Sequence, residues 1–418
     1  MFILYDYSDK CKHSKIGKIM SVFVPELLAP AGNLDKLKVA ISYGANAVYL
    51  AGLKFGLRSA ADNFTYEELK EGVEFAHSNN ALVYVVLNGF LHDSDLDELP
   101  EFVEFLDSLK IDAVIVSDIG VMQVVKKHSS IPIHVSTQSS CVNSQAAKLW
   151  KNFGAERVVL GREVTVKEAG KIKKDASVEV EMFIHGSMCM AYSGNCTISN
   201  FTQGRDSNRG GCAHSCRFEY SIDFKDEEEK KKAFFMSSKD LNGIQALPEY
   251  IEYEIDSVKV EGRMKSHLYA GTISKVYSDA LNFYKKNQNF LSDSLETWAD
   301  ELKKVTHRSY APVNLFEKAD NSTIFNERET TKEGEYIMAG RIVEVYKDQH
   351  MMIEVRNAFN VGDEIEILPF NGEVIKYKLN EIKNILNESI QRTNPSTLVK
   401  IPFHKDAKEN NIIRMRQV

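Results

Sequence analysis

The sequence predicts an α/β protein: a (β/α)8 barrel of the TIM type, followed by a small antiparallel β-barrel domain. Eight short apolar runs recur between residues 25 and 270, segments of helical period lie between most of them, and strand-like alternation begins after residue 335. Strands that alternate with helices form a parallel sheet, and eight of them match a closed barrel of roughly 250 residues. The eight runs are Glu26–Ala31, Ala47–Gly52, Leu82–Asn88, Ala113–Asp118, Ile133–Gln138, Arg157–Glu163, Val180–Gly186 and Ser257–Arg263.

An open, doubly wound sheet is the alternative, because it has the same local pattern of strands and helices. Two features favour the closed barrel. The number of runs reaches eight, and no glycine-rich dinucleotide-binding turn follows the first strand. Residues 29–33, Ala-Pro-Ala-Gly-Asn, close this first loop instead, with Asn33 in position to cap the next helix.

The chain divides into four segments. Residues 1–20 form a polar, Lys-rich tail, 21–290 the barrel, 291–334 a polar connector and 335–418 the C-terminal β-barrel domain. An insertion rich in Cys, Gly, Asn and Ser at 187–235 follows the seventh run; segments of this kind are functional or disordered, and the cysteines indicate that something holds this one in place. The strands predicted in the last segment, which has a hairpin turn at Asn371-Gly372, are Ile337–Tyr346, Met351–Val355, Asp363–Leu368, Glu373–Leu379 and Leu398–Pro402.

Charge and hydropathy exclude some classes of protein. The net charge of −7 argues against broad electrostatic affinity for nucleic acid, although Arg205, Arg209 and Arg217 leave room for a basic patch near the cysteines. No stretch approaches the roughly 20 apolar residues of a membrane-spanning helix, and the N-terminus lacks the apolar core of a secretory signal. We therefore expect a cytoplasmic protein with no membrane partner. In that compartment clustered cysteines indicate metal or redox chemistry.

The spacing C-x6-C-x15-C-x3-C describes the four cysteines of the insertion, which are Cys189, Cys196, Cys212 and Cys216. Four thiolates this close in the chain can converge on one centre, either an iron–sulfur cluster or a structural zinc ion. Zinc sites favour two close pairs, and only the second pair meets that spacing, so an iron–sulfur cluster is the preferred interpretation. Zinc ligation and free thiols remain open. Cys11 and Cys141 are interpreted as ordinary thiols.

Charged and amide side chains gather where the predicted barrel strands end, which is where active sites lie in this fold. Such groups are costly to bury unless they pair with one another or face a polar ligand. Several are cationic, which suits an anionic substrate, because Arg binds carboxylate or phosphate through two hydrogen bonds. The candidate catalytic residues are Glu163, His185, Glu261 and Arg263, and the candidate substrate-binding residues are Asn88, Gln138, Arg162, Lys239 and Lys265.

Two alternatives bear on these residues. The charged groups can pair with one another, for instance Arg263 with Glu163 or Glu261, and have no further role. A protease interpretation has no residues with a local signature, because the chain lacks H-E-x-x-H, G-x-S-x-G and P-loop motifs.

One long segment carries a family resemblance. Residues 181–199, Glu-Met-Phe-Ile-His-Gly-Ser-Met-Cys-Met-Ala-Tyr-Ser-Gly-Asn-Cys-Thr-Ile-Ser, resemble the signature of the peptidase U32 family. The similarity extends over about residues 25–310, and the C-terminal domain is similar to the one appended in longer members. The further similar segments are Glu26–Gly32, Ser238–Leu241, Val260–Lys265 and His307–Arg308.

The resemblance implies a function that differs from the family name. Its better-understood members are iron–sulfur proteins of RNA and quinone hydroxylation, and those with this architecture make 5-hydroxyuridine at the wobble position of tRNA. It implies a [4Fe–4S] cluster on the four cysteines of the insertion, tRNA as partner and prephenate as co-substrate. In air we expect such a cluster to be lost or replaced by zinc. Three possibilities stay open: a metal-assisted, collagenase-like peptidase, a non-catalytic RNA-binding or assembly protein, and ribosomal RNA or a quinone precursor as substrate.

Overall fold

The structure is a computed structural model that describes residues 22–57, 62–223, 231–321 and 334–417. The predicted tail at 1–20, with Cys11, lies outside the described residues. Within the described ranges, no helix is long and apolar enough to cross a membrane.

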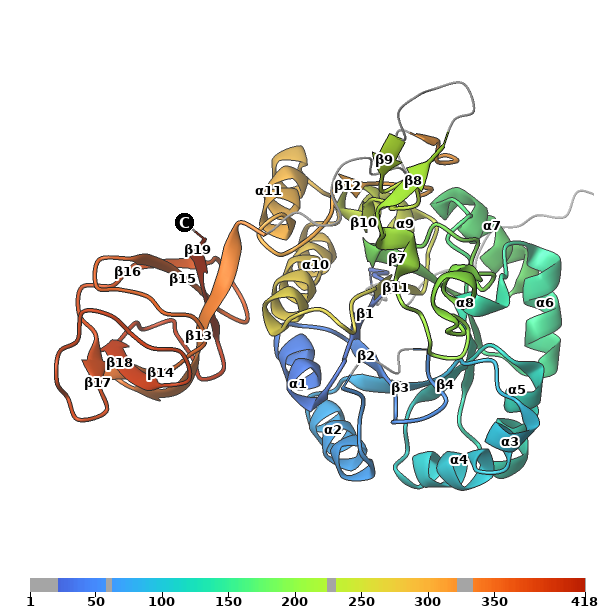
Figure 1. Ribbon diagram of the computed structural model, residues 1–418, viewed down its shortest axis with the longest axis horizontal. Coiled ribbons are helices and arrows are strands. Elements are labelled where there is room, and N and C mark those ends of the chain that lie inside the picture. The colour runs from blue at the N-terminus through green and yellow to red at the C-terminus, as the bar shows by residue number, and fades with distance from the viewer. Residues whose placement is uncertain (1–21, 58–61, 224–230, 322–333, 418) are drawn as a thin grey trace, which may run out of the picture.

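Eight parallel strands form a closed barrel (Figure 1). The first seven pair in chain order, and β11 pairs with both β7 and β1, which closes the ring. The predicted (β/α)8 barrel is confirmed, and the open sheet is excluded. The strands are β1 (Glu26–Pro30), β2 (Ala47–Leu50), β3 (Leu82–Leu87), β4 (Ala113–Val116), β5 (Ile133–Val135), β6 (Arg157–Val159), β7 (Glu179–Ser187) and β11 (Ser257–Val260).

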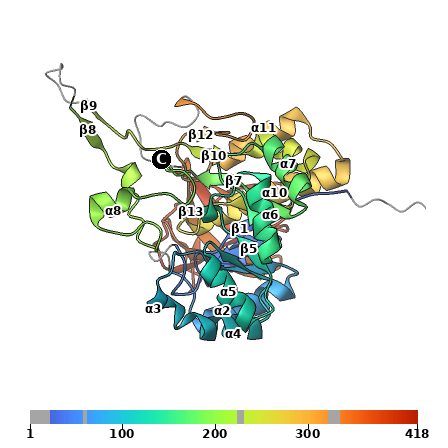
Figure 2. The same ribbon diagram turned by 90° about the vertical axis from the view of Figure 1, so that its right-hand side faces the viewer.

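Helices lie around the outside of the barrel (Figure 1 and Figure 2). Several begin at polar caps that the sequence supplies. The Asn33 side chain accepts a hydrogen bond from the Lys36 amide at 3.0 Å, as predicted, and Thr65 and Thr165 form capping boxes. The helices are α1 (Leu34–Ser42), α2 (Tyr66–Ser78), α3 (Asp93–Leu96), α4 (Leu99–Ser108), α5 (Ile119–His128), α6 (Ser144–Phe153), α7 (Val166–Ala176), α9 (Leu247–Glu252) and α10 (His267–Asn287).

One cluster of small and apolar side chains comes from the first four barrel strands: Leu28, Ala47, Tyr49, Ala51, Tyr84, Val86, Ala113 and Ile115. The remaining strands contribute buried charges to the same barrel. Arg157 donates to Glu26 at 2.7 Å, and Lys259 donates to Glu181 at 2.8 Å. Each charged side chain is paired with one of opposite sign, because burying an unpaired charge is very costly. The sequence analysis did not identify this buried network.

The insertion leaves the barrel after β7. It contains α8 (Ile198–Gln203) and a hairpin of β8 (Tyr220–Ile222) and β9 (Lys231–Ala233), which projects from the barrel in Figure 1. β10 (Asp240–Asn242) then returns antiparallel to β7. The predicted connector contributes α11 (Ser292–Leu302) and β12 (Tyr310–Ala311), which pairs with β10. The connector therefore joins the sheet beside the insertion.

The C-terminal segment is an antiparallel half-barrel with its own apolar core. Its strand order is β16-β15-β19-β13-β14-β18-β17, and the five predicted strands are all present. β17 and β19 were not predicted. The strands are β13 (Tyr336–Tyr346), β14 (His350–Val355), β15 (Glu364–Leu368), β16 (Ile375–Lys378), β17 (Lys383–Asn384), β18 (Leu398–Pro402) and β19 (Ile412–Arg416).

A buried ionic cluster joins the half-barrel to the barrel. Arg414 of β19 has no exposed surface; it donates to Glu366 of β15 at 2.6 Å and lies 2.5 Å from Glu301 of α11. Lys304, just after α11, lies 3.2 Å from Glu366. Burial alone would raise the pKa of Glu366, but Arg414 and Lys304 lower it below its usual value. Tyr43, at the end of α1, adds a 2.8 Å hydrogen bond to a β15 carbonyl.

We predict that Arg414→Met destabilises the docking of the half-barrel. Removing one partner leaves Glu366 buried without its main cation, which costs about 3–5 kcal/mol. Arg416→Met is the matched control, because Arg416 lies on the same strand with its side chain exposed. Thermal melting and limited proteolysis measure the effect. Equal melting temperatures for the two variants would contradict the assignment.

Candidate functional site

The cysteine loop, residues 188–196, docks on the ends of β5 and β6. The Ser193 amide and hydroxyl donate to one oxygen of Glu163, at 2.9 and 3.2 Å. Gly194 has φ +79°, and a Cβ there would lie 1.9 Å from the Gln138 carbonyl oxygen, so the fit requires glycine. The Asn195 side chain donates to the Ser140 hydroxyl at 2.9 Å. The loop thus lies directly against the C-terminal ends of two barrel strands.

Two arginines that the sequence suggested for a basic patch fasten the insertion instead. Arg209 lies 2.8 Å from Asp95 and donates to the Phe90 carbonyl at 2.7 Å, which ties the insertion to the loop after β3. Arg217 donates to the Ser238 carbonyl at 2.7 Å and also to the carbonyl of Met188, at the start of the cysteine loop. The third, Arg205, is exposed. These bonds fasten the insertion to the barrel.

The four thiols of the insertion converge on one region beside the barrel mouth. Burial raises the pKa of Cys216, Arg217 opposes the rise, and the thiolates of Cys189, Cys212 and Cys196 add to it, so all four are electrostatic neighbours. Within the described residues, no three His, Cys, Asp or Glu side chains are drawn together around a single ion. Four thiols are the donor set that an iron–sulfur cluster takes, and a structural zinc ion can take the same set.

Cys141 is a different kind of cysteine. It is fully buried in the apolar core, and burial raises the pKa of its thiol to about 11. Cys141 is not among the thiols that neighbour Cys216.

A small cavity of about 70 Å³ lies at the mouth of the barrel. Five of the nine candidate residues line it: Asn88, Gln138, Arg162, Glu261 and Arg263. Sequence reasoning missed Lys259, Tyr49 and Phe183, which also line it. The Lys259 ammonium stands 4.5 Å over the Tyr49 ring and donates to Glu181. A charged residue inside an alternating strand was the only signal for Lys259.

A second cavity, of about 160 Å³, lies between the cysteine loop and the barrel. Arg162 and Glu163 at the end of β6 form one wall, and Lys239 lies on the side toward β10. The cysteine loop lines the same cavity with Met188, Cys189, Met190, Ala191, Tyr192 and Ser193. Arg162 lines both cavities, so the two are neighbours across one side chain.

The guanidinium of Arg162 has no carboxylate partner among the described residues. It stacks on Phe183, with 4.1 Å between its central carbon and the ring centroid, and its buried Nε has no hydrogen-bond partner in the described structure. The predicted alternative of mutual pairing therefore does not account for this arginine. A half-buried cation without a counter-ion, facing two cavities, is the arrangement expected for an anion or a polar ligand.

His185 and Lys265 lie away from both cavities. His185 is buried among tyrosines, with hydrogen bonds of 3.2 Å joining its ring nitrogens to the hydroxyls of Tyr277 and Tyr310. Burial lowers its pKa to about 3, although Asp240 opposes the shift. Lys265 donates to a backbone carbonyl in the segment after α11. His185 is therefore a neutral packing residue near neutral pH.

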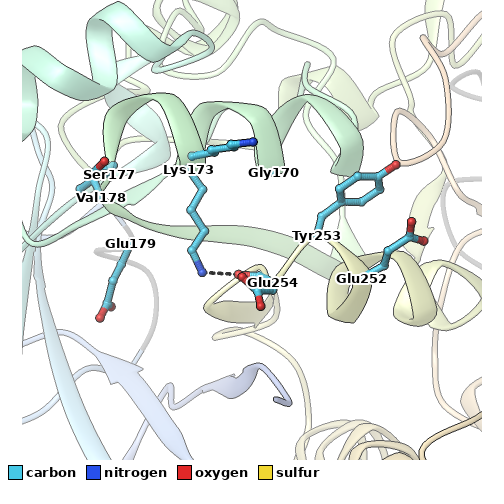
Figure 3. A pocket seen from close by; sticks show the side chains of 9 residues that line it. Gly170, Lys173, Ser177, Val178, Glu179, Glu252, Tyr253 and Glu254 are labelled. Carbon is cyan, nitrogen blue, oxygen red and sulfur yellow. Dashed lines mark hydrogen bonds between the residues drawn. The ribbon is translucent and has the colours of Figure 1, made fainter. Parts of the chain in front are cut away.

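The largest groove, of about 660 Å³, lies at the opposite end of the barrel between α7 and α9 (Figure 3). The amine of Lys173 is bound to the Glu254 carbonyl and lies 2.8 Å from Asp256. Glu179 lies on its wall and begins β7, which places the groove at the N-terminal ends of the strands. That face serves stability in this fold, so we place the functional site at the other end.

Comparison with known proteins identifies the family. The sequence matches peptidase family U32 over residues 32–325 and the C-terminal domain of the same family over residues 334–414. The chain belongs to peptidase family U32. The gap between the two matched regions, residues 326–333, lies within the predicted connector.

Relatives of this U32 protein differ in their named activities. The tRNA hydroxylation protein P1 of Bacillus subtilis is 38% identical over 97% of this chain and 98% of its own length. A 23S rRNA 5-hydroxycytidine synthase of Escherichia coli is 30% identical over 86% of this chain and 54% of its own. A protein named collagenase from Porphyromonas gingivalis is 27% identical over 92% of this chain and 96% of its own.

We predict that His185 stabilises the fold through its neutral form. Its pKa in the folded state, about 3, lies below the ordinary value of 6.5, so its contribution is complete above pH 6.5 and is lost as the pH falls toward 3. The stability difference between the wild type and His185→Gln should therefore shrink between pH 7.5 and pH 5, as measured by urea unfolding at each pH. A difference that grows on acidification would show that the histidine is charged in the folded protein.

Proposed function

We propose that this chain is a [4Fe–4S]-dependent tRNA-modifying enzyme that hydroxylates the wobble uridine at C5, with prephenate as co-substrate, in the cytoplasm. One observation carries the proposal. The loop that bears Cys189 lines the 160 Å³ cavity together with Arg162, which has no carboxylate partner among the described residues. A cysteine of the proposed cluster motif and a half-buried arginine thus line one cavity, which supports the proposal.

The four cysteines of the insertion would hold the cluster. When bound, it supplies one-electron chemistry that protein side chains lack, and oxidation at C5 of uracil needs such chemistry. The protein's own contribution is to bind and orient. Arg217 and Arg209 fix the insertion on the barrel, and Ser193 positions the loop on Glu163.

The similarity to the tRNA hydroxylation protein over nearly the whole chain supports an RNA substrate. The similarity to the rRNA hydroxycytidine synthase supports hydroxylation of a pyrimidine. A wobble base lies in a single-stranded loop, so it can be turned into a pocket without breaking a duplex. The exposed Arg205 is available for phosphate contacts from the insertion.

The mouth cavity suits the anionic group of a small metabolite. Arg162, Arg263 and Lys259 all line it, and guanidinium groups bind carboxylates through paired hydrogen bonds. Prephenate carries two carboxylates, which supports its assignment as co-substrate. The cavity of about 70 Å³ accommodates one such group rather than a whole ring-containing molecule.

Deletion of the gene should abolish wobble 5-hydroxyuridine, because the proposal assigns this modification to this enzyme. The wild-type gene should restore it. Cys189→Ser should not, because it removes one cluster ligand, and Cys141→Ser is the matched control, since that thiol lies in the apolar core. Mass spectrometry of nucleosides from total tRNA measures each strain.

Unchanged hydroxyuridine in the deletion strain would contradict the proposal. A purified Cys189→Ser protein that still binds tRNA but restores no hydroxyuridine would support catalysis over a binding or assembly role. Gelatin cleavage by colourless, zinc-containing protein would instead favour the peptidase interpretation, which one relative's name suggests.

A further inference from the structure

We propose that the 160 Å³ cavity between the cysteine loop and β6 is the nucleobase pocket, and that the 70 Å³ cavity across Arg162 is a separate anion subsite. The inference rests on the proposed RNA-modifying function and assigns its two ligands to two places. The target pyrimidine lies beside Cys189, with its polar edge toward Arg162 and Glu163.

The volumes of the two cavities indicate which ligand each one can hold. An engineered protein cavity of about 150 Å³ takes up benzene, so a cavity of that size admits a six-membered ring. The cavity below the cysteine loop, at about 160 Å³, reaches this size, whereas the mouth cavity, at about 70 Å³, does not. Only the former holds a pyrimidine ring.

The wall at the end of β6 offers the polar groups that a pyrimidine edge needs. Within the described structure, Oε2 of Glu163 is a buried acceptor and Nε of Arg162 a buried donor, and neither has a hydrogen-bond partner. Uracil presents an N–H donor beside a carbonyl acceptor, and cytosine an amino donor beside a ring-nitrogen acceptor. A buried polar group without a partner is costly, so a ligand that draws these two side chains toward the cavity and pairs with both is favoured.

Ser193 prepares Glu163 for this role. Its amide and hydroxyl both donate to Oε1, which fixes the carboxylate and leaves Oε2 as the oxygen without a partner. The guanidinium plane of Arg162 is fixed in turn by stacking on Phe183 at 4.1 Å. Ser193 and Phe183 thus hold the two side chains at the end of β6, beside the cavity.

The backbone at residues 313–314, which line the same cavity, is strained. Val313 lines it, is buried and has φ +51°, a conformation that β-branched residues rarely adopt. The Asn314 side chain holds this segment by donating to the Arg162 carbonyl at 2.8 Å. Strained residues of this kind cluster at ligand sites, where the surrounding structure compensates for them.

The rim of the cavity suits an unpaired loop of RNA. Tyr192 is 50% exposed and Met190 44% exposed, and both line the cavity. Phe201 on α8 of the same insertion is 89% exposed. Splayed bases of single-stranded RNA stack on such side chains, whereas a duplex offers no free base face.

Ala191→Leu tests the assignment, because it fills the cavity and removes no polar group. In the deletion strain it should restore at least about tenfold less hydroxyuridine than the wild-type gene. Gln203→Leu is the matched control, since it places the same leucine side chain at an exposed position on α8 of the same insertion. It should restore the full level.

A binding measurement separates insertion of the base from attachment of the RNA. The probe is an anticodon stem-loop RNA with 5-fluorouridine at the wobble position and fluorescein at its 5′ end. Its fluorine-19 resonance should shift on binding to anaerobically purified wild type and to Gln203→Leu. Ala191→Leu should bind the RNA within about threefold of the wild-type affinity, by anisotropy, without that shift.

Wild-type levels of hydroxyuridine with Ala191→Leu would overturn the pocket assignment, and so would a fluorine-19 shift with Ala191→Leu equal to that with the wild type. Should Ala191→Leu purify without iron, Arg162→Lys replaces it, because it keeps the charge, adds no bulk and loses Nε. It should restore at least tenfold less hydroxyuridine, and full restoration would overturn the assignment. A wild-type gene that restores none would instead overturn the proposed function itself.

Discussion

The hydrogen bonds between Ser193 and Glu163 are the contact on which the site depends. Glu163 follows the last residues of β6, so it is fixed to the barrel, and Ser193 lies between Cys189 and Cys196 in the chain. Docking the loop on this carboxylate therefore sets the position of two cysteines relative to the barrel mouth. Because Arg162 is the preceding residue, the same contact places an arginine beside the cavity that Cys189 also lines, and this arginine has no carboxylate partner among the described residues.

Beneath this contact, the barrel interior contains buried charged side chains beside the apolar cluster of the first four strands. Lys259 and Glu181 form a buried pair whose cation also lines the mouth cavity. A buried pair of this kind adds little net stability, but breaking it is strongly destabilising. The same group therefore serves the core and the site, which explains why a polar network is retained inside the strands. Arg414 plays the corresponding part between the domains, where it joins β19 to α11.

Periodicity was sufficient to predict the barrel, because parallel strands buried on both faces are continuous apolar runs. The residues predicted at the strand ends then included five that line the cavity at the barrel mouth, among them Arg162. The position of His185 was not predictable in the same way, since β7 continues to Ser187 and turns this side chain among tyrosines. Lys259 was missed because its partner, Glu181, lies 78 residues away in the chain. β19 was missed because only its pairing with β13 and β15 distinguishes so short a run.

The central claim is that the cysteine loop carries an iron–sulfur cluster beside a cavity that binds substrate. Electron paramagnetic resonance of anaerobically purified, reduced protein tests it most directly, with and without the anticodon stem-loop RNA. The account predicts about four iron and four sulfide per chain and a cluster signal whose shape changes when the RNA is added. Anaerobic protein without iron, or a cluster signal that the bound RNA leaves unchanged, would contradict it.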